Sequence, residues 1–173
     1  MTSNPVSIFW HRRDLRLEDN AGLYHALKSG LPVLPIFIFD KHILDKLENR
    51  YDKRVDFIHQ QLAEIKKQLN NLGSDLLVFY GIPEEIWPKI INQYNVKKVF
   101  TNHDYEPYAK ERDSWVTNFF ASNQITFNTY KDQCVFEFDE VLKDDGKPYT
   151  VFTPYSKKWK AKLNNFYLRS YPT

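Results

Sequence analysis

The chain has a single cysteine, Cys134, so no disulfide can form within it. This is typical of a protein that works in a reducing compartment, and we expect a cytoplasmic location. No apolar run approaches the roughly 20 residues that span a bilayer, and the first residues lack the pattern of a signal peptide. The sequence therefore predicts no membrane partner.

Charge of one sign is also scarce. The 173 residues carry 24 lysines and arginines against 22 acids, which gives a net charge of +2. So small an excess does not by itself argue for binding to nucleic acid. The 42% of hydrophobic and 27% of charged residues are the balance of an ordinary globular protein, and the length suits one domain.

Glycine-rich phosphate loops are missing as well. The chain has only five glycines, and they form neither a Gly-x-Gly-x-x-Gly motif nor a P-loop. This excludes the usual devices with which dehydrogenases and NTPases hold phosphate groups.

Five short apolar runs alternate with helical patterns along the chain. The runs are residues 6–10, 33–39, 76–80, 98–102 and 125–130. The run 33–39 is apolar on both faces, which favours a parallel sheet covered on both sides. Within it, Pro35 predicts that one end of the strand lies near a sheet edge or a bulge.

Helix signals fill the gaps between these runs. Asn20 is a capping residue, apolar residues recur at steps of three and four over 55–72 before Gly73, and Pro83 can open the next helix. A fourth pattern covers 108–119. We therefore expect an α/β fold: a doubly wound, Rossmann-like, five-stranded parallel sheet of order 3-2-1-4-5. Its ligand crevice lies at the switch point between strands one and four.

The character of the chain changes after Lys131. We expect residues 1–131 to form the Rossmann-like core and residues 132–173 to form a closing segment, within a single domain overall. This segment holds four lysines near Trp159, which we interpret as the solvated face of a helix rather than a DNA-binding patch.

The loop after the first strand is rich in charge. Three arginines, Arg12, Arg13 and Arg16, lie close to Asp14. Guanidinium groups bind phosphate or carboxylate in forked pairs, so the loop could clamp a ligand. The alternative is an internal network of ion pairs that fixes the loop.

The loop after the fourth strand carries Asp104 and Glu106, two residues apart. They could act as general acid and base, yet no nucleophile accompanies them. His11 and His103 could join them in a metal site by residue type, but no tight ligand spacing supports one, and we expect no metal.

Four ordered motifs resemble those of class I DNA photolyases and cryptochromes. They are WHRRDLRL at 10–17 with DN at 19–20, FIFD at 37–40 with IL at 43–44 and RV at 54–55, DYEPYA at 104–109 with RD at 112–113, and VFTPY at 151–155 with Tyr149 and Trp159. They cover nearly all of the chain, and in this order they are specific where one alone is weak. The sequence is thus similar to the N-terminal α/β (photolyase-homology) domain of that family.

The resemblance implies a light-driven parent protein. Family members repair cyclobutane pyrimidine dimers in DNA with blue light, or sense light. Their N-terminal domain holds an antenna chromophore, and their C-terminal helical domain holds FAD and binds damaged DNA. Because this chain stops near the interdomain connector, we expect it to lack catalytic residues, to contain no FAD and to repair no dimers alone.

Three functions remain open at this point. The first is the light-harvesting domain of a photolyase, a carbon–carbon lyase, and the second is the same domain of a cryptochrome photoreceptor. The third is a stand-alone nucleotide-binding domain, against which the closing motif around Tyr149 and Trp159 argues.

The resemblance and the switch point together give a set of expected antenna-binding residues: Trp10, His11, Phe37, Phe39, Asp40, Arg54, Asp104 and Glu106. A second set is expected to structure loops or face the missing domain: Arg12, Arg13, Asp14, Arg16, Tyr155 and Trp159. For the same reason we expect Phe152, Tyr155, Trp159 and Phe166 to be partly exposed.

The antenna itself is expected to be of the deazaflavin or flavin type, or the pocket to be empty. Folate-binding photolyases carry a glutamate in the first turn of the fourth helix, where this chain has Ala109. Alanine offers no acceptor to a pterin. The simpler alternative is that the charged residues of the first set only pair with Arg12, Arg13 and one another.

Overall fold

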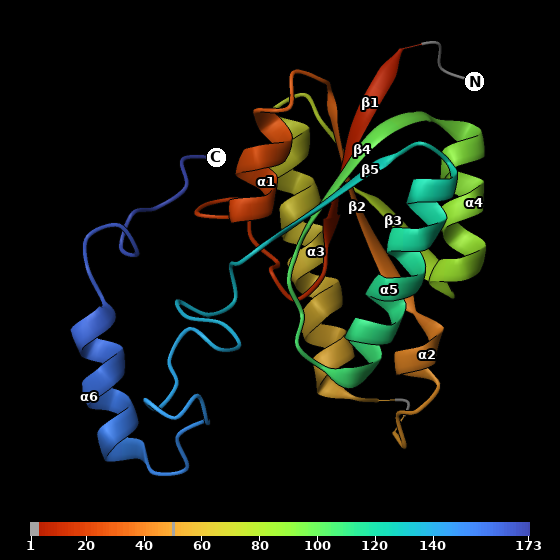
Figure 1. The fold of residues 1–173 in the computed structure, drawn as a ribbon. Helices are drawn as coiled ribbons and strands as arrows, with labels where there is room; N and C mark the ends of the chain where they lie inside the picture. Colours follow the sequence, from red (N-terminus) through yellow and green to blue (C-terminus); the bar gives the residue numbers. More distant parts are fainter. Residues whose placement is uncertain (1–3, 50) are drawn as a thin grey trace.

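The computed structural model describes residues 4–49 and 51–173. Its centre is a parallel five-stranded sheet of order β3-β2-β1-β4-β5, which confirms the predicted topology (Figure 1). The strands are β1 (Pro5–His11), β2 (Val33–Asp40), β3 (Leu77–Gly81), β4 (Asn95–Asn102) and β5 (Thr126–Tyr130).

Helices cover both faces of this sheet (Figure 1). The helices that flank the sheet are α1 (Ala21–Leu27), α3 (Lys53–Asn71), α4 (Pro83–Gln93) and α5 (Pro107–Ser122). The short helix α2 (Lys41–Leu44) follows β2 directly, and α6 (Phe152–Lys162), in the closing segment, lies away from the sheet (Figure 1). One core cluster joins the sheet to α4 and α5, and two smaller clusters join it to α3 and α1. The arrangement is a three-layer α/β sandwich.

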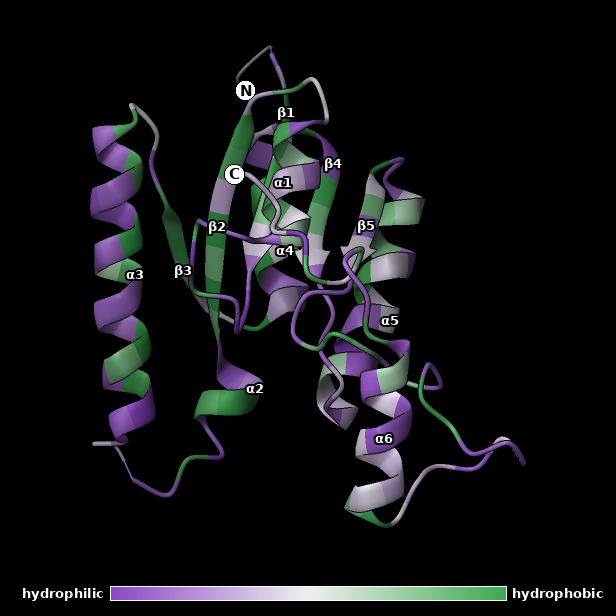
Figure 2. Ribbon diagram, turned by 90° about the vertical axis from the view of Figure 1, so that its left-hand side faces the viewer, coloured by the Kyte–Doolittle hydropathy of each residue, from purple (hydrophilic) through white to green (hydrophobic). Residues whose placement is uncertain are grey.

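Alternate side chains of β1 point to opposite faces of the sheet and so contribute to the core on each face. Ile8 and Trp10 belong to the cluster under α4 and α5, whereas Phe9 belongs to the cluster under α1. The apolar side of α3 faces the sheet and packs against Phe37 of β2, and its polar side faces away from the sheet (Figure 2). The predicted periodicity of 55–72 is therefore confirmed as an amphipathic helix.

The capping and helix-breaking residues identified in the sequence lie at the ends of the observed helices. Asn20 caps α1, with its side chain accepting a hydrogen bond from the backbone N–H of Leu23. Pro83 is the first residue of α4, and Gly73 follows α3 with a φ of 75°. Pro35 lies one residue before the point at which β2 begins to pair with β3, so its position near a local sheet edge is confirmed.

Two elements differ from the sequence prediction. Strand β4 begins at Asn95 rather than Lys98, because its first residues pair with Pro5 and Val6 at the start of β1. The short helix α2 was not predicted; it starts where the Asp40 side chain accepts a hydrogen bond from the His42 N–H.

The closing segment packs around Phe136. The rings of Trp159 and Tyr167 lie 5.4 and 4.8 Å from the ring of Phe136. Phe152 and Phe166 remain 78% and 73% exposed, and Tyr155 and Trp159 are half-buried, which confirms the expected exposure of these aromatic residues. In the described ranges, no helix is long and apolar enough to cross a membrane.

The two halves of the sheet meet at a buried polar cluster around Asn102, the last residue of β4. Its amide nitrogen donates to Asp14 Oδ2 at 2.6 Å and to Asn20 Oδ1 at 2.9 Å. Its amide oxygen accepts from the backbone N–H of Gly22 at 2.8 Å. One amide thus ties together the end of β4, the loop after β1 and the start of α1.

This cluster requires glycine at position 22. A Cβ there would lie 2.7 Å from Asn102 Oδ1 and 2.9 Å from a ring carbon of Phe9. We predict that Gly22→Ala lowers the free energy of unfolding by about 1–3 kcal/mol, although alanine is the better helix former. Urea unfolding followed by circular dichroism measures this, with Leu27→Ala at a 52% exposed position of the same helix as the control. Equal stability of Gly22→Ala and the parent chain would contradict the packing described.

A second prediction concerns His11, which is fully buried with its ring 4.5 Å from that of Phe9. Burial lowers the pKa of His11, against the opposing effect of Asp14. The unfolded chain then binds a proton that the folded chain does not, so stability falls as the pH drops below about 6.5, by at most about 1.4 kcal/mol per pH unit. Urea unfolding between neutral and mildly acidic pH should show a shallower dependence in His11→Phe, and equal slopes would sink the idea.

Candidate functional site

A cavity of about 420 Å³ opens beyond the carboxyl ends of β1 and β2. We call it the larger cavity. Its lining includes every residue that the sequence suggested for antenna binding: Trp10, His11, Phe37, Phe39, Asp40, Arg54, Asp104 and Glu106. They come from four separate stretches of the chain. The ends of neighbouring parallel strands bring most of them together, and Arg54 comes from the first turn of α3.

The walls of the larger cavity are mostly apolar. Phe37 and Phe39 lie on one face of β2, with ring centroids 5.0 Å apart. Further apolar side chains, which sequence reasoning had not assigned to the site, come from α2 and the loop after it and from the first turns of α3: Ile43, Leu44, Leu47, Val55 and Ile58. Ile43, Leu44 and Val55 stood in the family motifs, but only the fold shows that they face the same space as Phe37.

Trp10 and His11 are among the most deeply buried residues of the cavity lining. Trp10 is 2% exposed and belongs to the core under α4 and α5. The Nδ1 atom of His11 lies 3.3 Å from the carbonyl oxygen of Asp14. Both residues therefore shape the cavity mainly through packing.

A hydrogen bond from Tyr108 to Asp40 bounds one side of the cavity. The Tyr108 hydroxyl donates to Asp40 Oδ2 at 2.5 Å, across 68 residues of sequence. Partial burial, followed by the negative charge and hydrogen bond of Asp40, raises the pKa of Tyr108, so the hydroxyl keeps its proton and remains a donor. Tyr108 belongs to the DYEPYA motif, but the sequence alone predicted no role for it.

The remaining charges of the cavity are partly paired. Arg13 contacts both Asp104, at 3.2 Å, and Glu106, at 2.5 Å. Arg54 contacts Asp52, the residue that caps α3, at 2.6 Å, and its side chain is 76% exposed. Arg13 thus lies between the two acids that had been considered as general acid and base.

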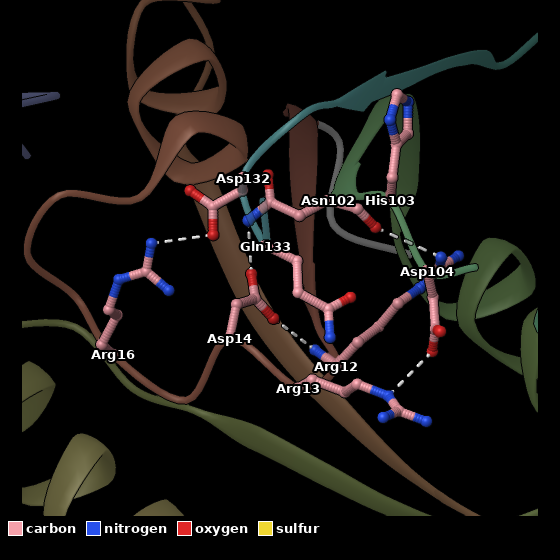
Figure 3. Close-up of a pocket in the computed structure, with 9 residues that line it drawn as sticks. All are labelled: Arg12, Arg13, Asp14, Arg16, Asn102, His103, Asp104, Asp132 and Gln133. Atoms are coloured by element: carbon pink, nitrogen blue, oxygen red, sulfur yellow. Dashed lines mark hydrogen bonds and ion pairs between the residues drawn. The ribbon is translucent and has the colours of Figure 1, made fainter. Parts of the chain in front are cut away.

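A smaller cavity of about 190 Å³ lies beside the larger one, over the ends of β1 and β4 (Figure 3). Each arginine of the first loop that faces it is bound to a carboxylate. Arg12 pairs with Asp113 at 2.7 Å, and Arg16 pairs with Asp132 at 2.8 Å. Together with the pairing of Arg13, the geometry is that of an ion-pair network rather than of open guanidinium groups.

The two histidines line different cavities, His11 the larger one and His103 the smaller one. His103 contacts Glu137 at 2.7 Å and Thr129 at 3.0 Å, away from His11. Among residues 4–49 and 51–173, no group of three or more histidine, cysteine or acidic side chains is placed to hold a metal ion.

Tyr155 and Trp159 lie outside both cavities. Trp159 packs on Phe136, and the ring of Tyr155 lies 6.1 Å from that of Tyr149. Ala109, by contrast, lines the larger cavity and is 2% exposed, so it presents a methyl group where a longer side chain would enter the space.

Comparisons with known proteins point to one family. The family model for DNA photolyase matches residues 7–172. A deoxyribodipyrimidine photo-lyase of Synechococcus is 34% identical over 89% of this chain and 32% of its own length. Cryptochrome-1 of Anopheles gambiae is 37% identical over 84% of this chain and 28% of its own length.

A solved structure is similar as well. That of an archaeal photolyase from Sulfolobus tokodaii with two FAD molecules has a TM-score of 0.74 and 31% identity, covering 91% of this chain and 35% of that one. The chain spans about a third of the length of the curated photolyases that it matches. It belongs to the DNA photolyase family and has the fold of the family's N-terminal domain.

Proposed function

We propose that this chain is the light-harvesting domain of a deoxyribodipyrimidine photolyase, and that the larger cavity holds its antenna chromophore. One observation carries the proposal. Residues from the loops after β1, β2 and β4 line a single space with apolar walls and a few polar groups. Such a space suits a flat, conjugated ring.

An antenna has modest chemical demands. It absorbs a photon and passes the energy on, so the protein must hold the ring rigidly, dry and at a fixed angle. Phe37 and Phe39 supply flat apolar surface, and Val55 and Ile58 lie near them. Asp40, Asp104 and Arg54 could fix the orientation through hydrogen bonds to the ring's substituents or its side chain.

The lining favours a flavin or deazaflavin over a folate. At Ala109 the cavity offers no side-chain acceptor, and a buried pterin donor left unpaired costs about 1–3 kcal/mol. The Sulfolobus tokodaii photolyase, which shares 31% identity, was solved with two FAD molecules, with the implication of a novel light-harvesting cofactor. That relative supports a flavin-type ligand here.

In this proposal the repair chemistry lies elsewhere. FAD and the residues that act on a pyrimidine dimer belong to a helical domain outside these residues, and the chain alone is inactive in repair. The similarity to Cryptochrome-1 of Anopheles gambiae keeps a photoreceptor as the second candidate. Light-driven dimer repair by a protein that joins this chain to its flavin domain separates the two.

The polar groups of the cavity provide the test of ligand binding. We predict that Asp104→Ala weakens riboflavin binding about 5- to 30-fold, because it removes a hydrogen-bonding group worth about 1–2 kcal/mol. Arg54→Ala should weaken binding less, because the Arg54 side chain is largely exposed and already contacts Asp52. Fluorescence anisotropy of riboflavin titrated with the purified chain measures the affinity. Asp56→Ala, an exposed acid on the first turn of α3, is the matched control. Unchanged affinity in both cavity variants would show that these residues only pair within the protein.

A further inference from the structure

Two buried arginines lie over the ring of Trp10 in the lining of the larger cavity. The guanidinium carbon of Arg12 is 4.2 Å from the centroid of the ring, and that of Arg112 is 4.9 Å away. Arg12 comes from the loop after β1 and Arg112 from α5, and the side chain of each is only 5% exposed. All three residues line the larger cavity.

The charge around this ring is unevenly balanced. Asp113 accepts two hydrogen bonds from Arg12, both at 2.7 Å, and one from Arg112 at 3.2 Å. One carboxylate therefore serves two cations. Burial, followed by the charge of Arg112, lowers the pKa of Arg12 to about 10, which leaves Arg12 charged at neutral pH.

The unpaired nitrogens of these arginines point to the ring as their partner. Nε of Arg12 and Nη2 of Arg112 are buried, and among the described residues neither finds a hydrogen-bond acceptor. The π face of Trp10 is the electron-rich group over which both guanidinium groups lie. Desolvated cation–π contacts of this kind draw on the electron density of the indole.

A tryptophan next to an antenna chromophore would ordinarily quench the excited state of that chromophore. An indole is easily oxidised, and a photoexcited isoalloxazine ring is a strong one-electron oxidant. Trp10 would give one electron to the excited ring, leaving an indole radical cation, and the electron would return in the dark with the light energy lost as heat. The ring of Trp87, 5.2 Å from that of Trp10, could share the positive hole and make the loss more efficient.

We propose that Arg12 and Arg112 hold positive charge over Trp10 so that this indole does not donate an electron to an excited chromophore in the larger cavity. A cation 4–5 Å from the ring opposes the formation of a second positive charge there, and the low polarity of the site strengthens the effect. The inference rests on the proposed function, since it concerns the lifetime of a bound antenna.

The same arginines also have a structural role, because Arg12 and Asp113 join the loop after β1 to α5. A purely structural role would affect folding and affinity, whereas electrostatic protection affects the excited-state lifetime of the bound ring. Arg112→Gln removes the charge and keeps most of the side-chain length, while Arg112→Lys keeps the charge. Trp115→Phe, at a half-buried tryptophan of α5, is a control for loss of an indole elsewhere.

The experiment measures the fluorescence lifetime of riboflavin bound to the chain, at saturation, so that affinity does not enter. We expect a lifetime about tenfold shorter in Arg112→Gln than in the parent chain, recovery in Arg112→Gln combined with Trp10→Phe, and a near-parental value in Arg112→Lys. Trp115→Phe combined with Arg112→Gln should not recover the lifetime. An unchanged lifetime in Arg112→Gln, or one equally short after removal of Trp10, would overturn the proposal.

A measurement on chains that retain Arg112 keeps the proposal testable if the Arg112 variants do not fold. Transient absorption after excitation of bound riboflavin should show no tryptophan radical in the parent chain. A tryptophan radical that forms in the parent chain but not in Trp10→Phe would overturn this proposal, although it would still agree with an antenna site in the larger cavity. Failure of riboflavin to bind the parent chain would instead overturn the proposed function, and the inference with it.

Discussion

The side-chain amide of Asn102 joins the parts of the fold on which the rest of the molecule depends. It lies where connections leave β1 and β4 in opposite directions, and it contacts Asp14, Asn20 and Gly22 within 3 Å. A buried amide with all its groups satisfied specifies one arrangement of its neighbours, because each lost partner would leave a polar group without water. Asn102 lines the smaller cavity, and Arg12, which donates a hydrogen bond to the carbonyl oxygen of Asn102, lines both cavities.

The charged residues around Asn102 act mainly on one another. Each arginine of the loop after β1 is bound to a carboxylate from a distant part of the chain, and this leaves the larger cavity with apolar walls and few open polar groups. Arg12 shows how one residue can serve several ends. It ties the loop to α5 through Asp113, and it places charge over the ring of Trp10.

Sequence reasoning succeeded where the signal was local. The caps and breaks at Asn20, Gly73 and Pro83 depend on a few neighbouring residues, and the order of the strands follows from the α/β alternation. Part of the lining of the larger cavity was predictable because the carboxyl ends of parallel strands converge, whereas the apolar side chains from α2 and α3 were not assigned to it. Contacts across long stretches were not: Tyr108 to Asp40 and Arg12 to Asp113 depend on how α5 packs, which no short pattern encodes.

The central claim is that a flat chromophore binds in the larger cavity. NMR chemical-shift mapping of the isotope-labelled chain during titration with riboflavin tests it most directly. The account predicts that the largest amide shifts fall at Phe39, Asp40, Arg54 and Asp104, with little change in α6. Shifts confined to the closing segment, or no shifts at saturating riboflavin, would contradict it.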